Sequence, residues 1–536
     1  MNRRDFLARA VPAASTLPFL IGGFPIRAHS SSPLLRALAS TAAATDRVLV
    51  LVQLNGGNDG LNMVIPRDQY SILSLARPNI MISEGAVLPL TAATGLHPSM
   101  TGLQSLYQAG KLTVVQGVSY PNPNFSHFRA TDIWLTGSDY NQQVSSGVMG
   151  RYLDEEFPGF PVGYPNVGMP DPPALSIGSI VSPGVQGTQV PMGMAIADPN
   201  ASYILPGGSD VAPNTPSGHE LTFIRQVAEQ TQVYTAAVRG ANGRVANIAT
   251  YPTGNSLADQ LKIVARLVAG GLMTRVYVVT LGGFDTHSAQ VDAADHSIGT
   301  HATLLGRISG AVSAFQADLL ALGAEDRVIG MTFSEFGRRI KSNASIGTDH
   351  GTAVPMFLFG KHVNGGVLGT NPVLGKIPNP VTLADVKDNL EMQFDYRRVY
   401  GTILRDWFGA TPAELQAALN TPLFDGSQAS LGLISPGAIL DVGDAPPVPD
   451  RYALEQNYPN PFNPETTIRF ELPETRSVSL EVFNAAGQRV AVLAEGERGA
   501  GVHEIRFNAS DLSSGTYFYR LRAGEFNETR KAVLVR

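Results

Sequence analysis

The sequence has no cysteine among its 536 residues, which excludes disulfides, thiolate metal ligands and a cysteine nucleophile. Charged residues make up only 16%, and the net charge of −6 comes without a long basic run. A nucleic-acid partner is therefore not expected, because such proteins cluster Lys and Arg on one face. In contrast, Gly and Pro are frequent, at 55 and 37 residues, which indicates long connecting loops. A chain of this length should contain two or three domains.

The N-terminal region lacks an apolar run long enough for a stable transmembrane span. Its most apolar stretch, 11–26, is short and interrupted by Pro and Gly. It follows residues 2–7 (NRRDFL), which resemble a twin-arginine export signal. We therefore expect 1–44 to be a signal peptide and leader, cleaved between Ala28 and Ala44, with the twin-arginine machinery as a partner and the periplasm as the first destination.

Apolar runs that end abruptly at polar residues mark the strands of a buried parallel sheet. The runs are 47–54, 276–281 and 328–333. Between the last two, apolar residues recur at helical spacing from Leu304 to Leu319, so that strand, helix and strand form a βαβ unit. Ligands bind at the carboxyl ends of such strands. The candidate side chains there are Asp59, Asp285, His287, Glu335, Arg338, Asp349 and His350.

These residue types point to a metal-dependent, hydrolytic site. Carboxylates and imidazoles bind divalent metals, and an arginine suits an anionic oxygen. Structural alternatives remain open for two sets. Asp59 could cap an Asx turn, and Glu335 and Arg338 could pair at i, i+3 on the first turn of a helix. The pair Asp349-His350 is expected to be buried in a Gly-rich turn, where few structural roles would explain it.

Ser126 precedes a helix predicted from about Ala130 to Trp134. Free backbone N–H groups and the helix dipole favour an anion at such a position, which suits a serine that attacks phosphorus. An ordinary N-cap role is the alternative. The segment 137–218 is dense in Gly and Pro and is expected to be a loop-rich insertion over the site. Other predicted elements are helices 219–239, 257–272 and 395–407, a strand 354–359 followed by His362, and a linker 426–449.

The last segment, 450–536, has a different pattern. Strand-like alternation separated by Asn, Gly and Ser turns predicts a small antiparallel β-sandwich. Its residues 454–464 (LEQNYPNPFNP), 515–521 (GTYFYRL) and 531–536 (KAVLVR) closely resemble the type A sorting domain of the type IX secretion system. The resemblance implies a Bacteroidetes-like source, the type IX machinery as a partner, and a final location at the cell surface or outside the cell.

Residues up to about 425 resemble the exported bacterial family called domain of unknown function 1501. The matching motifs are 3–7 (RRDFL), 54–60 (LNGGNDG), 126–129 (SHFR), 283–287 (GFDTH), 334–338 (SEFGR) and 348–351 (TDHG). A wider similarity is to the alkaline phosphatase superfamily, which implies an α/β domain over 45–425 with a mostly parallel sheet and helices on both faces. It also implies Ser126 as nucleophile and metal ligands Asp59, Asp285, His287, Asp349 and His350. Arg338 is the candidate anion contact, because an arginine suits an anionic oxygen. Supporting positions would be His127, Glu335 and His362.

The resemblance implies a secreted hydrolase of a small-molecule or polymer-linked phosphate or sulfate ester, with zinc, manganese or calcium. Sulfate is disfavoured, because residues 126–129 lack the proline of the motif that sulfatases oxidise to formylglycine. The close spacing of Asp285 and His287, and the absence of a motif around His362, leave a one-metal or non-catalytic site open. The rival functions are a surface binding protein that retains the fold and a carbohydrate-active enzyme with an Asp/Glu pair.

Overall fold

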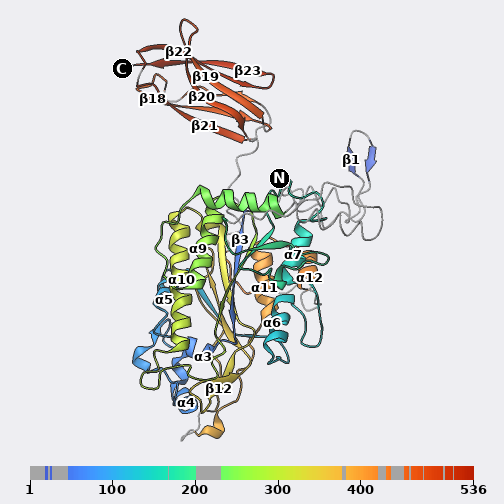
Figure 1. Cartoon of the computed structure of the whole chain (residues 1–536), viewed down its shortest axis with the longest axis vertical. Helices are drawn as coiled ribbons and strands as arrows, with labels where there is room; N and C mark the ends of the chain where they lie inside the picture. The colour runs from blue at the N-terminus through green and yellow to red at the C-terminus, as the bar shows by residue number, and fades with distance from the viewer. Residues whose placement is uncertain are drawn as a thin grey trace. The chain divides into compact units, whose positions relative to one another are not determined.

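The computed structural model describes residues 19–21, 24–26, 46–166, 168–200, 231–376, 382–419, 430–435, 452–457, 460–474, 476–498, 501–510 and 512–535. They form two compact units, which divide between Ile439 and Leu440 (Figure 1). The twin-arginine motif, the cleavage region, the first half of the helix expected over 219–239 and most of the expected linker 426–449 lie outside the described residues.

A nine-stranded, mostly parallel sheet forms the centre of the first unit (Figure 1). The strand order is β15 (Gly366–Leu368), β7 (Leu112–Ser119), β14 (Val354–Phe359), β11 (Val328–Phe333), β3 (Val48–Asn55), β10 (Val276–Gly282), β8 (Ala174–Ile177) and β9 (Gly193–Ile196). The short β16 (Phe394–Asp395) pairs with β7. Strand β14 is antiparallel to both neighbours, and the other pairs are parallel. Strands β3, β7, β10 and β11 therefore end at one edge, where β14 begins.

Both faces of this sheet are buried, which explains the uninterrupted apolar runs. In β3, Val48, Val50 and Val52 belong to one core, together with side chains of α5 (Thr101–Gln108), α9 (Ser256–Ala269) and α10 (Thr300–Ala321). Leu49 and Leu51 face the opposite core, which includes α6 (His127–Thr136), α7 (Val148–Glu156), α11 (Tyr396–Asp406) and α12 (Pro412–Leu419). The predicted α/β class, with helices on both faces, is confirmed.

Two predicted segments differ from the structure. Residues 137–218 do not form only loops, because they supply α7 and the strands β8 and β9, which extend the main sheet. The alternative of an i, i+3 pair on a helix for Glu335 and Arg338 is wrong, since 334–337 is a loop and Arg338 begins a strand. That strand, β12 (Arg338–Ser342), pairs with β13 (Thr348–His350) in an antiparallel hairpin.

Smaller elements surround the loop after β3. They are α3 (Gly60–Met63), α4 (Tyr70–Ala76) and a three-stranded sheet of β4 (Val64–Pro66), β6 (Thr94–Leu96) and β5 (Leu88–Pro89). A separate two-stranded pairing joins β1 (Phe19–Ile21) to β2 (Phe24–Ile26). Within the described part of the chain, no helix has the length and apolar character needed to cross a membrane.

The second unit is an antiparallel β-sandwich, as predicted. One sheet contains β17 (Ala453–Leu454), β18 (Glu465–Leu472) and β21 (Gly501–Asn508), and the other contains β20 (Arg489–Arg498), β19 (Arg476–Asn484), β22 (Gly515–Ala523) and β23 (Phe526–Leu534). Alternate side chains such as Ile468, Phe470, Leu480 and Leu521 enclose one apolar core. The period-2 pattern in the sequence therefore reflects strands with one face buried and one exposed.

Candidate metal centre

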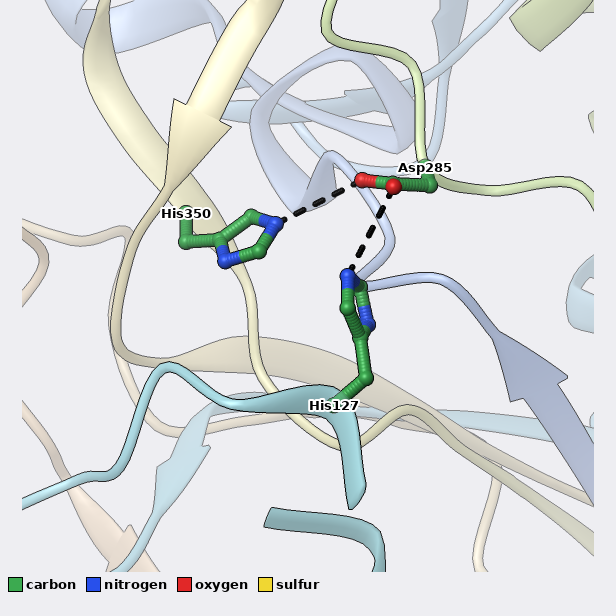
Figure 2. A group of neighbouring side chains, drawn as sticks. All are labelled: His127, Asp285 and His350. Atoms are coloured by element: carbon green, nitrogen blue, oxygen red, sulfur yellow. Dashed lines mark hydrogen bonds and ion pairs between the residues drawn. The ribbon is translucent and has the colours of Figure 1, made fainter. Parts of the chain in front are cut away.

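Three imidazoles converge on one carboxylate at the carboxyl edge of the main sheet. His127 is the first residue of α6, Asp285 and His287 follow β10, and His350 ends β13. Asp285 Oδ2 lies 3.6 Å from His127 Nε2, and Oδ1 lies 3.1 Å from His287 Nε2 and 3.4 Å from His350 Nε2. Figure 2 shows the Asp285 carboxylate facing ring nitrogens of His127 and His350. The two Nε2 atoms of His287 and His350 are 2.9 Å apart.

Two of the three imidazoles, His127 and His350, have a hydrogen-bond acceptor at the other ring nitrogen. Nδ1 of His127 lies 2.8 Å from Glu335 Oε1, and Nδ1 of His350 lies 2.9 Å from the carbonyl oxygen of Phe125. Nδ1 of His287 lies 3.5 Å from Asp349 Oδ1. Protons on Nδ1 of His127 and His350 leave the Nε2 lone pairs of these two rings free to face Asp285. Proteins commonly orient metal-binding histidines through such contacts.

The electrostatic environment favours ligand forms of both residue types. Burial acts against ionisation of Asp285, but the hydrogen bond and charge of Arg338, with His287 and His127, hold its pKa below the usual value. Burial lowers the pKa of His350, and Arg338 and His127 act in the same direction. The Phe125 carbonyl and Asp285 oppose this shift without reversing it. An ionised carboxylate and a neutral imidazole are the forms that bind a metal ion.

Arg338 holds the site together instead of facing a substrate. Its side chain is wholly buried, and Nε donates to the Gly57 carbonyl at 2.6 Å. Nη1 donates to the Thr348 carbonyl at 2.8 Å, and Nη2 donates to Asp285 Oδ1 at 2.7 Å. Nη1, which has two hydrogens, also lies 3.4 Å from Nδ1 of His287. The predicted role of Arg338 as an anion contact does not agree with this geometry.

Glu335 is also buried, at 2% exposure, and joins two parts of the site. Its Oε1 accepts from the Gly56 N–H at 2.8 Å as well as contacting His127. The predicted supporting role of Glu335 thus has a physical form: this carboxylate ties the loop after β3 to the first residue of α6. His127, expected only as a supporting residue, is instead one of the converging imidazoles. Its position directly after Ser126 was the sequence signal.

The structure does not bring Asp59 to the cluster. Asp59 is fully buried and caps α3. Arg77 Nη1 donates to both of its carboxylate oxygens, at 2.9 Å to Oδ1 and 2.6 Å to Oδ2. Gln290 Nε2 donates to Oδ2 at 2.7 Å. Burial opposes its ionisation, but Arg77 and the other donors keep the pKa of Asp59 below its usual value. The arginine and the donors occupy this carboxylate, so it does not fit the predicted role of metal ligand.

His362 lies at the opposite edge of the sheet, against expectation. Because β14 is antiparallel, the chain that leaves it at Phe359 emerges at the amino ends of β3 and β11. There His362 Nε2 contacts Asp326 Oδ1 at 3.0 Å. Asp349 also differs, because its side chain is 54% exposed and not buried. It lies beside the cluster as the partner of His287, and its Oδ1 accepts from Asn343 Nδ2 at 3.1 Å.

Ser126 occupies the N-cap position of α6, but its side chain makes no capping hydrogen bond. Its residue is exposed, and its backbone N–H donates to Asn124 Oδ1 at 2.8 Å. Although the alternative prediction of an N-cap serine is right about position, the hydroxyl is not used for capping. It stands one residue from a converging imidazole, at a helix end that favours an anion.

Three of the converging residues, His127, Asp285 and His350, have the spacing of a candidate metal site, and His287 lies beside them. Tetrahedral zinc with ligands at roughly 2.0–2.1 Å separates neighbouring donor atoms by roughly 3.3 Å. The contacts of Asp285 with the three Nε2 atoms span 3.1–3.6 Å, and the His287–His350 separation is 2.9 Å. One Asp and two of the histidines, His127 and His350, present donor atoms that all lie within 4.8 Å of one another. The chemistry of the donor set suits zinc, although it does not fix the metal.

Family models match part of the first unit and most of the second. Residues 220–419 match the family described as "Protein of unknown function (DUF1501)", and residues 456–535 match the "Secretion system C-terminal sorting domain". Both resemblances stated from the sequence are confirmed. The sorting domain indicates a protein exported to the cell surface or the extracellular space. The twin-arginine signal stays a prediction. None of the curated proteins matches the chain significantly.

Similar solved structures include PsFucS1 sulfatase from Pseudoalteromonas sp., with 11% identity over 77% of this chain and 78% of that chain, and a TM-score of 0.32. A structure from work on glycosaminoglycan metabolism by Bacteroides thetaiotaomicron has 11% identity over 83% and 89%, with a TM-score of 0.32. PorZ of the Porphyromonas gingivalis type-IX secretion system has 18% identity over 18% of this chain and 13% of that chain, with a TM-score of 0.12. With TM-scores below 0.5, these likenesses carry no statement about activity.

Proposed function

We propose that this exported protein is a metal-dependent hydrolase of phosphate esters, with sulfate esters as the second choice. Its metal ligands are His127, Asp285, His287 and His350, and Ser126 is its nucleophile. The observation that supports the proposal most strongly is the shared orientation of the three imidazoles: each turns Nε2 toward Asp285, and two of them, His127 and His350, have a hydrogen-bond acceptor at Nδ1. Proteins commonly orient metal-binding histidines through such acceptors.

Residues around the ligands keep this geometry fixed. Glu335, Asp349 and the Phe125 carbonyl set the ring orientations, and Arg338 holds Asp285 from the buried side. When bound, a divalent ion would supply Lewis-acid polarisation of an ester oxygen and would favour the deprotonated serine. Because the carboxylate of Asp59 is paired with Arg77, the proposal involves one ion and not the two that the superfamily resemblance implies.

Ser126 is suited to attack because its hydroxyl is exposed and not engaged in capping. The N-terminus of α6 would face the negative oxygens of the ester. The attack would form a Ser126 Oγ–phosphorus bond as the P–O bond to the alcohol breaks, and the alcohol would leave with the proton of the serine. Water would then cleave the phosphoserine, which releases phosphate and restores the Ser126 hydroxyl. Phosphate is preferred to sulfate, because 126–129 (SHFR) lacks the proline of the formylglycine motif. The rival function is a surface protein without turnover. It is favoured by the position of Asp59, which pairs with Arg77 and lies outside the cluster.

Hydrolysis of p-nitrophenyl phosphate by the metal-loaded full chain tests the proposal. We expect release of p-nitrophenol that the Ser126→Ala change lowers by at least about a hundredfold, while the bound metal stays unchanged. Equal activity of wild type and Ser126→Ala would remove the serine from the mechanism. A metal-loaded protein inert to phosphate and sulfate esters would favour the rival.

A further inference from the structure

Exposed aromatic side chains are concentrated beside the metal centre. Among the described residues, the exposed ones are Phe125, Phe128 and Tyr140, with 43%, 92% and 45% of their surface accessible. All three fall within the stretch 125–140, which contains the nucleophile and His127. Isolated exposed apolar residues need no explanation, but three exposed aromatic residues in one short stretch that also supplies His127 indicate a binding surface.

The chain around the three rings is tied to the metal centre. The Phe125 carbonyl accepts from His350 Nδ1, and its ring lies 6.5 Å from that of Phe336. Phe336 in turn packs against His127 and His350, with ring centroids 4.9 and 4.5 Å apart. Phe128 directly follows His127 on the first turn of α6.

Arg129 brings the third ring to the same region. Its guanidinium donates from Nη2 to the carbonyl of Asp139 at 3.1 Å and to that of Tyr140 at 3.3 Å. A further bond reaches the carbonyl of Gln142. The loop that carries Tyr140 is therefore fastened to the first turn of α6, next to Phe128.

The polar residues between the rings suggest what this surface binds. Exposed amide side chains flank the aromatic ones: Asn122, Asn141, Gln142 and Gln143. An aryl or lipid group would favour a continuous apolar surface. A sugar ring can contact both kinds of side chain. Its C–H face packs on the electron-rich face of an aromatic ring, and its hydroxyls form hydrogen bonds with amides.

We propose that Phe125, Phe128 and Tyr140 form an aromatic rim that binds the sugar rings of a saccharide, and that this saccharide carries the phosphate or sulfate ester presented to Ser126. The proposal rests on the proposed function for the ester, but the rim itself needs neither metal nor turnover. It makes the substrate a glycan, which an exported protein meets outside the cell.

An array of neutral, phosphorylated and sulfated glycans, probed with the full chain with and without zinc, tests the aromatic rim. Phe128→Ala and Tyr140→Ala each remove one ring. Leu320→Ala is the matched control, since Leu320 is 56% exposed and lies near the end of α10. We expect wild type and Leu320→Ala to bind a common set of glycans, and Phe128→Ala to weaken that binding at least about tenfold.

The outcomes separate this proposal from the hydrolase. Glycan binding that depends on Phe128 but is accompanied by no ester hydrolysis would support the aromatic rim and contradict only the proposed function. Hydrolysis of small esters without glycan binding would overturn the aromatic rim. Equal glycan binding by wild type and Phe128→Ala would also overturn it. A third result would overturn it as well: Phe128→Ala loses hydrolysis of phenyl phosphate, and the wild type binds no glycan. That result would show that the surface binds an aryl group.

Discussion

At the scale of single residues, the site depends on side chains that do not touch the expected metal. Glu335 is the clearest example, because its buried carboxylate accepts from both the Gly56 N–H and His127. Its neighbour in the sequence motif, Arg338, donates to the loop after β3, to the Thr348 carbonyl of β13 and to Asp285. Sequence spacing suggested a helical pair for these two residues. Several of their actual partners, such as Gly56 and Asp285, are more than 50 residues away in the chain, which spacing cannot reveal.

Glu335→Gln should weaken metal binding about 10- to 100-fold, because the amide keeps the shape of Glu335 but loses the charge that orients His127. Zinc titration followed by calorimetry measures the change. Glu391→Gln serves as the control, since Glu391 is 74% exposed and pairs only with Lys387 among the described residues. An unchanged zinc affinity in Glu335→Gln would show that the Glu335 carboxylate does not orient the His127 imidazole for metal binding.

A second residue-scale prediction concerns His301, which is fully buried and lies 2.9 Å from Asn58 Oδ1 through Nε2. Burial lowers the pKa of His301 to about 4. The unfolded chain takes up this proton near pH 6.5 and the folded chain only near 4, so the free energy of unfolding falls as pH drops through that window. The stabilisation from keeping His301 neutral is complete above about pH 6.5.

Urea unfolding of wild type and His301→Gln at pH 7.5 and 5 tests this. Both tryptophans, Trp134 and Trp407, lie in the first unit, so their fluorescence reports that unit. Between pH 7.5 and pH 5, the free energy of unfolding of the wild type should fall by about 2 kcal/mol more than that of the variant. Burial also lowers the pKa of His97, to about 3. Because both proteins contain His97, its contribution to the pH dependence is common to them and drops out of the comparison. Parallel losses in the two proteins would contradict the assignment.

At the scale of elements, the rule that ligands gather at the carboxyl ends of parallel strands placed Asp285 and His287 correctly beside each other. The same rule failed for His362, because the apolar run of β14 is the same in either strand direction and only pairing shows it to be antiparallel. It also failed for Asp59, since nothing in the local sequence marks Arg77 as its partner. The hairpin of β12 and β13 was missed because the polar run 338–350 lacks a strand-like apolar alternation.

The loop after β3 gives a prediction at this scale. Gly56 has φ of +123°, and a Cβ there would lie 2.3 Å from the backbone nitrogen of Asp285. Gly56→Ala should therefore displace Asp285, the proposed metal ligand, and so weaken zinc binding. It should also lower the free energy of unfolding of the first unit by about 1–3 kcal/mol. Gly282→Ala, at the end of β10, is the control, because a Cβ there meets nothing within 4 Å. Equal zinc affinity in the two variants would contradict this account of the loop.

At the scale of the whole molecule, the chain joins an α/β unit that contains the candidate centre to a sandwich recognised as a secretion sorting domain. The sequence predicted both architectures, since buried parallel strands and half-buried antiparallel strands have different apolar periods. It predicted the residue types of the candidate site but not which of those residues come together. His127, Asp285, His287 and His350 come from three separate segments, and only their approach in space distinguishes them from Asp59 and His362.

The central claim is that these four side chains bind one metal ion. Zinc, manganese and calcium content of the full chain, measured by mass spectrometry after reconstitution and dialysis, tests it beside a His127→Ala/His350→Ala double variant and an Asp59→Asn variant. The account predicts one ion per chain in wild type, loss of that ion in the double variant, and retention in any folded Asp59→Asn protein. No bound metal in wild type, or two ions of which one depends on Asp59, would contradict it.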